Sequence, residues 1–188
     1  MAVAEHHLIT GPSRGGKSEW AEHQIALLAT GREVTYLATG PAANGDSSWD
    51  ERLERHRRRR PDNWTLIEAS KASAVCAVLT DVSQKQQLIL LDSLGGIVAA
   101  ELGSDPVNWL KMQEMLIVAI RQRSTSVVMV AEEVGWGVVP ATALGGLFRD
   151  RNGEFVRRCA DISSQRWLVA AGQALPMHAL AQIVPAQP

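Results

Sequence analysis

The sequence predicts an α/β fold in which a mostly parallel sheet is covered by helices on both faces. Three observations support this prediction. Short apolar segments of strand length alternate with longer segments of helical character along the chain. Two of the apolar segments, LILL and VVMVA, are uninterrupted, which is typical of strands buried on both faces of a parallel sheet. A glycine-rich segment separates the first strand from the first helix.

The strands are predicted from runs of apolar residues with little polar interruption. They lie at residues 7–10, 33–38, 64–68, 87–91, 127–131 and 166–170. Parallel neighbours need crossover connections, which are right-handed in nearly all known folds. The expected arrangement is therefore doubly wound, with helices on both sides of the sheet.

The helices are predicted between the strands, at residues 17–30, 49–59, 70–83, 106–123 and 142–161. Pro106 stands at a favourable first-turn position, and Asp105 before it is a candidate N-cap. Two segments are predicted to be loops. Residues 40–48 are rich in Gly, Asn, Asp and Ser, and the C-terminal tail, residues 172–188, begins with Gly172.

The composition fits a single domain over residues 1–188, with 46% hydrophobic and 21% charged side chains. A net charge of −1 argues against a general nucleic-acid binder, whose surface is strongly basic. No segment approaches the roughly 18 apolar residues of a membrane span, and the start lacks a secretory signal, so we expect a cytoplasmic protein. Cys76 and Cys159 lack metal-ligand spacing and are expected to be core residues.

The glycine-rich segment meets the pattern G-x-x-x-x-G-K-[S/T] in full, between a predicted strand and a predicted helix. Glycines there let successive N–H groups turn toward phosphate oxygens, and the helix dipole adds to the attraction. The lysine reaches the β- and γ-phosphates, and the serine hydroxyl ligates Mg²⁺. The sequence therefore predicts that ATP or GTP is bound, with Ser18 as a Mg²⁺ ligand, by Gly11, Pro12, Ser13, Arg14, Gly15, Gly16, Lys17 and Ser18.

Acidic residues follow two of the buried strands, at the end where ligands bind in open α/β sheets. Asp92 comes directly after LILL, and Glu132 and Glu133 come after VVMVA. A phosphate-loop domain needs such a carboxylate to hold Mg²⁺ directly or through water. Asp92 is therefore predicted to be a metal ligand and Glu133 a nucleotide-site residue. A helix cap or a turn is the alternative role for Asp92, and Glu132 is expected to be a solvated neighbour.

A strongly basic segment, residues 55–60, lies between the second and third strands. Five of its six residues are arginine, and the sixth is His56. The exposed face of a helix would explain the run, because Asp50, Glu51 and Glu54 balance its charge. Alternatively, clustered guanidinium groups bind phosphates, and an imidazole among them is a nucleophile toward phosphorus. The segment by itself leaves both interpretations open.

Several segments occur in one order between residues 8 and 168: LITGPSRGGKSEWAE, VTYLAT, RLERHRRRRPDNW, LLDSL, AEEVGWGVVP and FRDRNG. Together they resemble the bifunctional adenosylcobinamide kinase / adenosylcobinamide-phosphate guanylyltransferase family of cobalamin biosynthesis. Many kinases share the phosphate loop. The resemblance is specific because a histidine four residues before an Arg-Pro pair, and the later E-V-G-x-G-V-V-P, are features of this family.

The resemblance implies a RecA-like P-loop domain that forms a homo-oligomer, often a trimer. It implies that the chain phosphorylates adenosylcobinamide with ATP or GTP, then transfers GMP from GTP to that phosphate through a covalent GMP-histidine. His56 occupies the position of that histidine, so His56 and Lys17 are predicted to be catalytic, and Arg52, Arg59 and Arg60 are candidate phosphate contacts. The implied partners are adenosylcobinamide and nucleotide.

The sequence departs from the family pattern at Gly40, Glu132, Val156, Arg157 and Ser164. These positions leave open whether both activities are retained. One alternative is a P-loop kinase for another small molecule without guanylyl transfer. Another is a nucleotide-dependent binding or regulatory protein without transferase chemistry.

Overall fold

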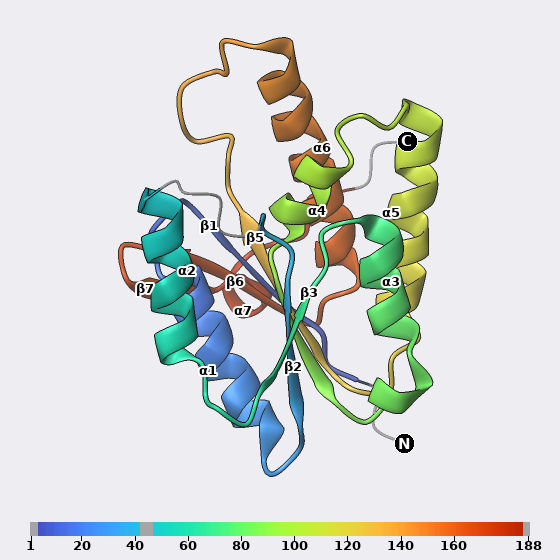
Figure 1. Cartoon of the computed structure of the whole chain (residues 1–188). Coiled ribbons are helices and arrows are strands. Elements are labelled where there is room, and N and C mark those ends of the chain that lie inside the picture. The colour runs from blue at the N-terminus through green and yellow to red at the C-terminus, as the bar shows by residue number, and fades with distance from the viewer. Residues whose placement is uncertain (1–3, 42–46, 186–188) are drawn as a thin grey trace.

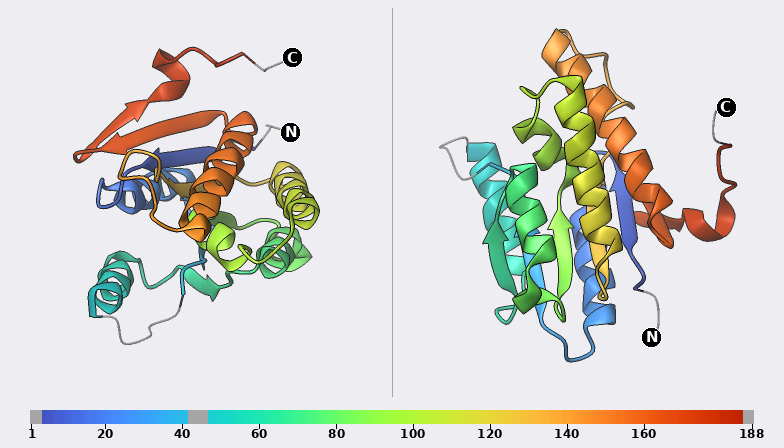
Figure 2. Two further views of the ribbon diagram at one scale, coloured as in Figure 1. Left: turned by 90° about the horizontal axis from the view of Figure 1, so that it is seen from above. Right: turned by 90° about the vertical axis from the view of Figure 1, so that its right-hand side faces the viewer.

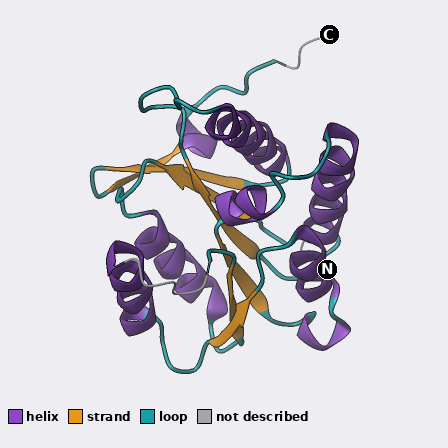
Figure 3. Cartoon of the chain, turned by 45° about the horizontal axis from the view of Figure 1, so that its top comes forward, coloured by secondary structure: helices purple, strands orange, loops and turns teal. Residues whose placement is uncertain are grey.

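The structure, a computed structural model, describes residues 4–41 and 47–185 and contains one seven-stranded sheet (Figures 1 and 3). The strand order is β3-β2-β4-β5-β1-β6-β7. All neighbours pair in parallel except β6 and β7, which are antiparallel, so the prediction of a mostly parallel sheet is confirmed. The strands are β1 (His7–Gly11), β2 (Val34–Ala38), β3 (Thr65–Glu68), β4 (Leu88–Asp92), β5 (Val127–Glu132), β6 (Gln165–Ala170) and β7 (Gln173–Pro176).

Helices cover both faces of the sheet, as Figures 1 and 2 show. On one side lie α1 (Lys17–Ala29) and α2 (Ser47–Arg59). On the other lie α3 (Ala72–Thr80), α4 (Leu94–Ala100), α5 (Pro106–Arg121) and α6 (Ala143–Asp161). A 3₁₀ turn, η1 (Val82–Gln84), follows α3, and a short helix, α7 (Met177–Leu180), follows β7. No helix in the described part of the chain is long and apolar enough to cross a membrane.

Alternating side chains of the central strands form two separate cores. Ile9, Leu90 and Val130 pack toward α1, in a cluster that also holds Ala21 and Ile25 of that helix. Their neighbours in sequence, among them Leu91 and Met129, belong to the cluster on the opposite face. Because successive residues of a strand point to opposite faces, uninterrupted apolar runs bury both sides of the sheet.

Two of the predicted helices can be compared with the structure at their ends. Asp105 caps α5, because its carboxylate accepts a hydrogen bond from the backbone N–H of Asn108, and Pro106 begins that helix, as predicted. The predicted helix over residues 70–83 is shorter in the structure, ending at Thr80 before η1. Cys159 is buried in the core and Cys76 packs against the same cluster, as expected.

The prediction of a loop from residue 172 onward is wrong in part. Ala171 and Gly172 both have positive φ angles, 52° and 73°, and turn the chain back so that β7 pairs with β6. The hairpin is followed by α7, whose His178 lies edge-on to Trp167 of β6 at 5.1 Å between ring centroids. These tertiary contacts order a segment whose composition favours a loop.

The buried His6 makes the stability of the fold depend on pH. It is 5% exposed, its Nδ1 accepts a hydrogen bond from the backbone N–H of Val127, and burial lowers its pKa to about 4. In the unfolded chain His6 therefore binds a proton near pH 6.5, whereas in the folded chain it remains neutral down to about pH 4. The contribution of neutral His6 to the free energy of unfolding is therefore fully present above about pH 6.5. It is lost as the pH falls from 6.5 toward 4.

We expect the free energy of unfolding to fall by about 2 kcal/mol, because of His6, when the pH is lowered from 7.5 to 5. Urea unfolding at the two pH values measures the loss. His6→Asn keeps a side-chain acceptor beside Val127 but does not titrate in this range, so the variant should lose correspondingly less. If the wild type and His6→Asn lost the same free energy of unfolding, the pH dependence would not come from His6.

Candidate active site

The loop between β1 and α1 depends on glycine at two positions. Gly16, the residue before α1, has a φ of 100°, which favours glycine. At Gly11 a Cβ atom would lie 2.0 Å from the carbonyl oxygen of Val169, so no larger residue fits against β6. Lys17 Nζ donates to the Pro12 carbonyl at 2.7 Å, which holds the ammonium group against the loop. Glycine and the adjoining strand thus fix the loop at the start of α1.

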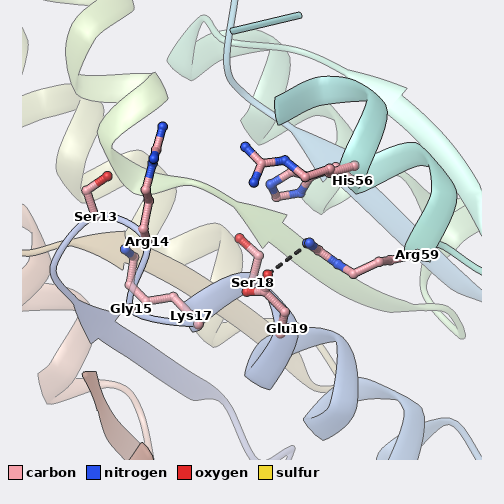
Figure 4. A pocket seen from close by; sticks show the side chains of 10 residues that line it. Ser13, Arg14, Gly15, Lys17, Ser18, Glu19, His56 and Arg59 are labelled. Carbon is pink, nitrogen blue, oxygen red and sulfur yellow. Dashed lines mark hydrogen bonds and ion pairs between the residues drawn. The ribbon is translucent and has the colours of Figure 1, made fainter. Parts of the chain in front are cut away.

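A cavity of about 340 Å³ lies in front of this loop (Figure 4). In Figure 4 side chains of α2 and of the phosphate loop face one another across it. Residues at the N-terminus of α1 line this space, and the backbone N–H groups and dipole of a helix N-terminus attract anions. The cavity is therefore suited to the phosphates of a nucleotide. It is lined by Ser13, Arg14, Gly15, Gly16, Lys17, Ser18, Glu19, Arg55, His56 and Arg59.

An ion-pair cluster connects α2 to α1 at the edge of the cavity. Arg59 Nε donates to Glu22 Oε2 at 3.0 Å. Arg59 Nη1 donates to Glu19 Oε1 at 2.9 Å, the contact drawn in Figure 4. Burial raises the pKa of Glu22, and the hydrogen bond and charge of Arg59 oppose that rise. Arg59 therefore ties the helix that carries His56 to the helix that follows the phosphate loop.

A second, smaller cavity of about 160 Å³ lies on another side of His56. It is bounded by the ends of β2, β3 and β4 and by α2. Its lining combines apolar side chains with charged ones: Tyr36, Ala38, Gly40, Pro41, His56, Arg57, Arg60, Leu66, Glu68, Asp92, Ser93, Gly96 and Glu132. Because His56 lines both cavities, it forms a wall that they share.

Tyr36, Asp92 and His56 meet at this wall. Tyr36 Oη donates to Asp92 Oδ2 at 2.7 Å and lies 3.1 Å from His56 Nδ1. The distance between Asp92 Oδ2 and His56 Nδ1 is 3.7 Å. Burial, followed by the nearby charge of Asp92, raises the pKa of Tyr36, which keeps the hydroxyl protonated at neutral pH. The sequence identified Asp92 and His56 but gave no role to Tyr36.

The two glutamates after β5 have different partners. Glu132 accepts hydrogen bonds from Ser93 Oγ and from the backbone N–H of Gly95, and it lines the second cavity. The expectation of a solvated neighbour is therefore wrong, because the residues after β4 cover its carboxylate. Glu133 accepts from Thr10 Oγ1 at 2.6 Å beside the end of β1, and it lines neither cavity.

The structure separates the predicted site residues into two groups. Residues of the phosphate loop from Ser13 to Ser18 line the first cavity, whereas Asp92 and Arg60 line the second. The guanidinium carbon of Arg60 lies 4.1 Å from the centre of the Tyr36 ring, a cation–π contact. Of the five positions that depart from the family pattern, Gly40 and Glu132 line the second cavity. The other three lie elsewhere, on α6 and just before β6: Val156, Arg157 and Ser164.

The oxygen donors of the site fit Mg²⁺, which prefers hydroxyl, carboxylate, phosphate and water ligands. Ser18 supplies a hydroxyl in the first cavity, and Asp92 supplies a carboxylate at the end of β4. Within the described residues, no group of three or more His, Cys, Asp and Glu side chains could hold a metal ion by itself. The donor set therefore suits a cation that takes further ligands from nucleotide phosphates and water.

Comparisons with known proteins agree on one family. A family model described as cobinamide kinase / cobinamide phosphate guanyltransferase matches residues 7–177. The chain is 30% identical over 180 residues to the bifunctional adenosylcobalamin biosynthesis protein CobU of Escherichia coli, covering 88% of this chain and 95% of that protein. It is 33% identical over 184 residues to the protein of the same name from Salmonella typhimurium, with the same coverage.

Similarity to solved structures supports the fold alone, because the sequence identities are low. A KaiC-like protein from Pyrococcus horikoshii has a TM-score of 0.50 and 11% identity, over 87% of this chain and 70% of that chain. An ATPase from a bacterial type III secretion system has a TM-score of 0.57 and 12% identity, over 99% of this chain and 60% of that chain. The sheet order and these neighbours identify a RecA-like P-loop fold.

Proposed function

This chain belongs to the cobinamide kinase / cobinamide phosphate guanyltransferase family, and we propose that both reactions of the family take place around the wall formed by His56. The kinase step uses the phosphate loop, and the guanylyl transfer uses the loop together with the histidine. The observation that carries the proposal is that His56 lines the same cavity as Lys17 and Ser18.

In the kinase step the loop holds the phosphates of ATP or GTP, with Lys17 on the β- and γ-phosphates. The aminopropanol hydroxyl of adenosylcobinamide attacks the γ-phosphorus and releases its proton to water. The bond between the γ-phosphorus and the bridging oxygen breaks, and the nucleoside diphosphate leaves. The loop N–H groups, Lys17 and the arginines beside the cavity stabilise the charge that develops on the phosphate oxygens.

In the transfer step the neutral imidazole of His56 attacks the α-phosphorus of GTP. A nitrogen–phosphorus bond forms, the bond from the α-phosphorus to the β-phosphate oxygen breaks, and pyrophosphate leaves. The phosphate of adenosylcobinamide phosphate then attacks the same phosphorus, which breaks the nitrogen–phosphorus bond and releases adenosylcobinamide-GDP. Mg²⁺, held by Ser18, Asp92 and the phosphates, would neutralise charge on the departing group. The family resemblance favours a homo-oligomer as the working form.

The proposal is tested with GTP carrying ³²P at either the α- or the γ-phosphorus. Purified protein is incubated with Mg²⁺ and each nucleotide, denatured and separated by electrophoresis. We expect acid-labile label on the protein from α-labelled GTP and none from γ-labelled GTP. Label from the γ-position would indicate a phosphorylated protein instead, and a protein that binds GTP without acquiring either label would refute the histidine intermediate.

A further inference from the structure

The strand register brings Tyr36 and Asp92 together. β2 and β4 are parallel neighbours in which Ala38 lies opposite Asp92. Tyr36 precedes Ala38 by two residues, so its side chain emerges on the same face of the sheet as Asp92. α2 covers this end of that face and places His56 within 3.1 Å of the Tyr36 hydroxyl. Three elements thus meet at one phenolic oxygen.

The single proton of the Tyr36 hydroxyl determines how these groups are connected. The distance from Tyr36 Oη to Asp92 Oδ2 is 2.7 Å, whereas that to His56 Nδ1 is 3.1 Å. A carboxylate only accepts, so the phenol donates its proton to Asp92 and offers a lone pair to His56. The contact between Tyr36 and His56 therefore needs a proton on Nδ1.

We propose that Tyr36 is a positioning residue that holds His56 as the Nδ1–H tautomer, with the lone pair on Nε2 and Nε2 directed away from Tyr36. The proposal rests on the GMP-histidine step proposed above. An imidazole attacks phosphorus through an unprotonated nitrogen, and the hydrogen bond at one nitrogen determines which one that is. Tyr36 and Asp92 would thus act on His56 as a buried carboxylate acts on the histidine of a catalytic triad.

The contacts of His56 with Tyr36 and Asp92 also suit the positive charge that the His56 ring carries in the GMP-histidine intermediate. When Nε2 bonds to the α-phosphorus, the ring keeps its Nδ1 proton and becomes positively charged. Asp92 Oδ2, 3.7 Å from Nδ1, is placed to stabilise that charge. When the substrate phosphate displaces the histidine, the electron pair returns to Nε2. His56 therefore completes the cycle without gaining or losing a proton.

The variant Tyr36→Phe removes the hydroxyl and keeps the ring that packs under Arg60. In single-turnover experiments with α-labelled GTP, we expect formation of GMP-His56 to slow by about 10- to 100-fold, because the imidazole loses its fixed tautomer and orientation. ATP-dependent phosphorylation of cobinamide has no step at His56 and should slow by a smaller factor than formation of GMP-His56 does. Thr35→Val is the matched control, since it also removes a buried hydroxyl from β2 but one that bonds to Gln87.

Nitrogen-15 NMR of histidine-labelled protein supplies a readout that does not depend on turnover. The His56 signals, identified by their loss in His56→Asn, should report the Nδ1–H tautomer in the wild type and a mixture in Tyr36→Phe. An Nε2–H tautomer in the wild type, or labelling of Tyr36→Phe at the wild-type rate, would overturn the proposal. If the wild type acquires no GMP, the proposed GMP-histidine intermediate is refuted. The NMR tautomer measurement then still tests whether Tyr36 orients His56.

Discussion

Replacement of His56 by asparagine is expected to separate the two reactions of this protein. Guanylyl transfer to cobinamide phosphate should fall by about a thousandfold or more, because no nucleophile is left to form the GMP intermediate. Phosphorylation of cobinamide by ATP should stay within about threefold of the wild type, since the phosphate loop is intact. Steady-state assays with cobinamide and with cobinamide phosphate, run on the same preparation, measure both rates.

His23→Asn is a suitable control, because it makes the same chemical change at an exposed position on α1, outside both cavities. Both of its rates should equal those of the wild type. Equal transfer rates in His56→Asn and His23→Asn would show that His56 lies beside the phosphate loop without serving as nucleophile. The chain would then have to transfer GMP directly from GTP.

Replacement of Lys17 by alanine should impair both reactions together. The ammonium group lies against the loop, where we propose that the β- and γ-phosphates bind, and both proposed steps expel a phosphate-bearing group. We expect each kcat/KM to fall by about a thousandfold, the order of loss seen when one electrostatic contact to a transition state is removed. Lys111→Ala on α5, an exposed lysine outside both cavities, provides the comparison.

The outcome for Lys17→Ala also tests how far the two reactions share one loop. A variant that loses phosphorylation of cobinamide but still forms GMP-His56 at the wild-type rate would show that GTP binds elsewhere for the second step. Measuring the label from α-³²P-GTP on Lys17→Ala distinguishes these cases directly.

The sequence predicted most of the sheet because burial on both faces leaves a strong local signal. The runs LILL and VVMVA are strands β4 and β5, and the phosphate loop follows β1 as its pattern requires. By contrast, α4 was missed because it has seven residues and contains Gly95 and Gly96, which disfavour a helix in isolation. β7 was missed because its pairing depends on the turn at residues 171 and 172 rather than on its own composition.

The candidate site was predictable where one segment contains the whole pattern, and not where several segments meet. Asp92 could be found because it ends an apolar strand, and His56 could be found from the resemblance. Tyr36 has only a weak signal, its position two residues before the end of β2, and its partners come from two other elements. Glu132 was misjudged because the order of strands, which brings Ser93 beside it, cannot be read from the sequence.

The shared position of His56 has a consequence for the timing of catalysis. A GMP group on this histidine would occupy space next to the loop residues that we propose to hold the phosphates of the next nucleotide. One chain would therefore perform its two reactions in succession, never at once. ATP and GTP would compete for the same loop, so the relative supply of the two nucleotides would set how long cobinamide phosphate persists before it is converted.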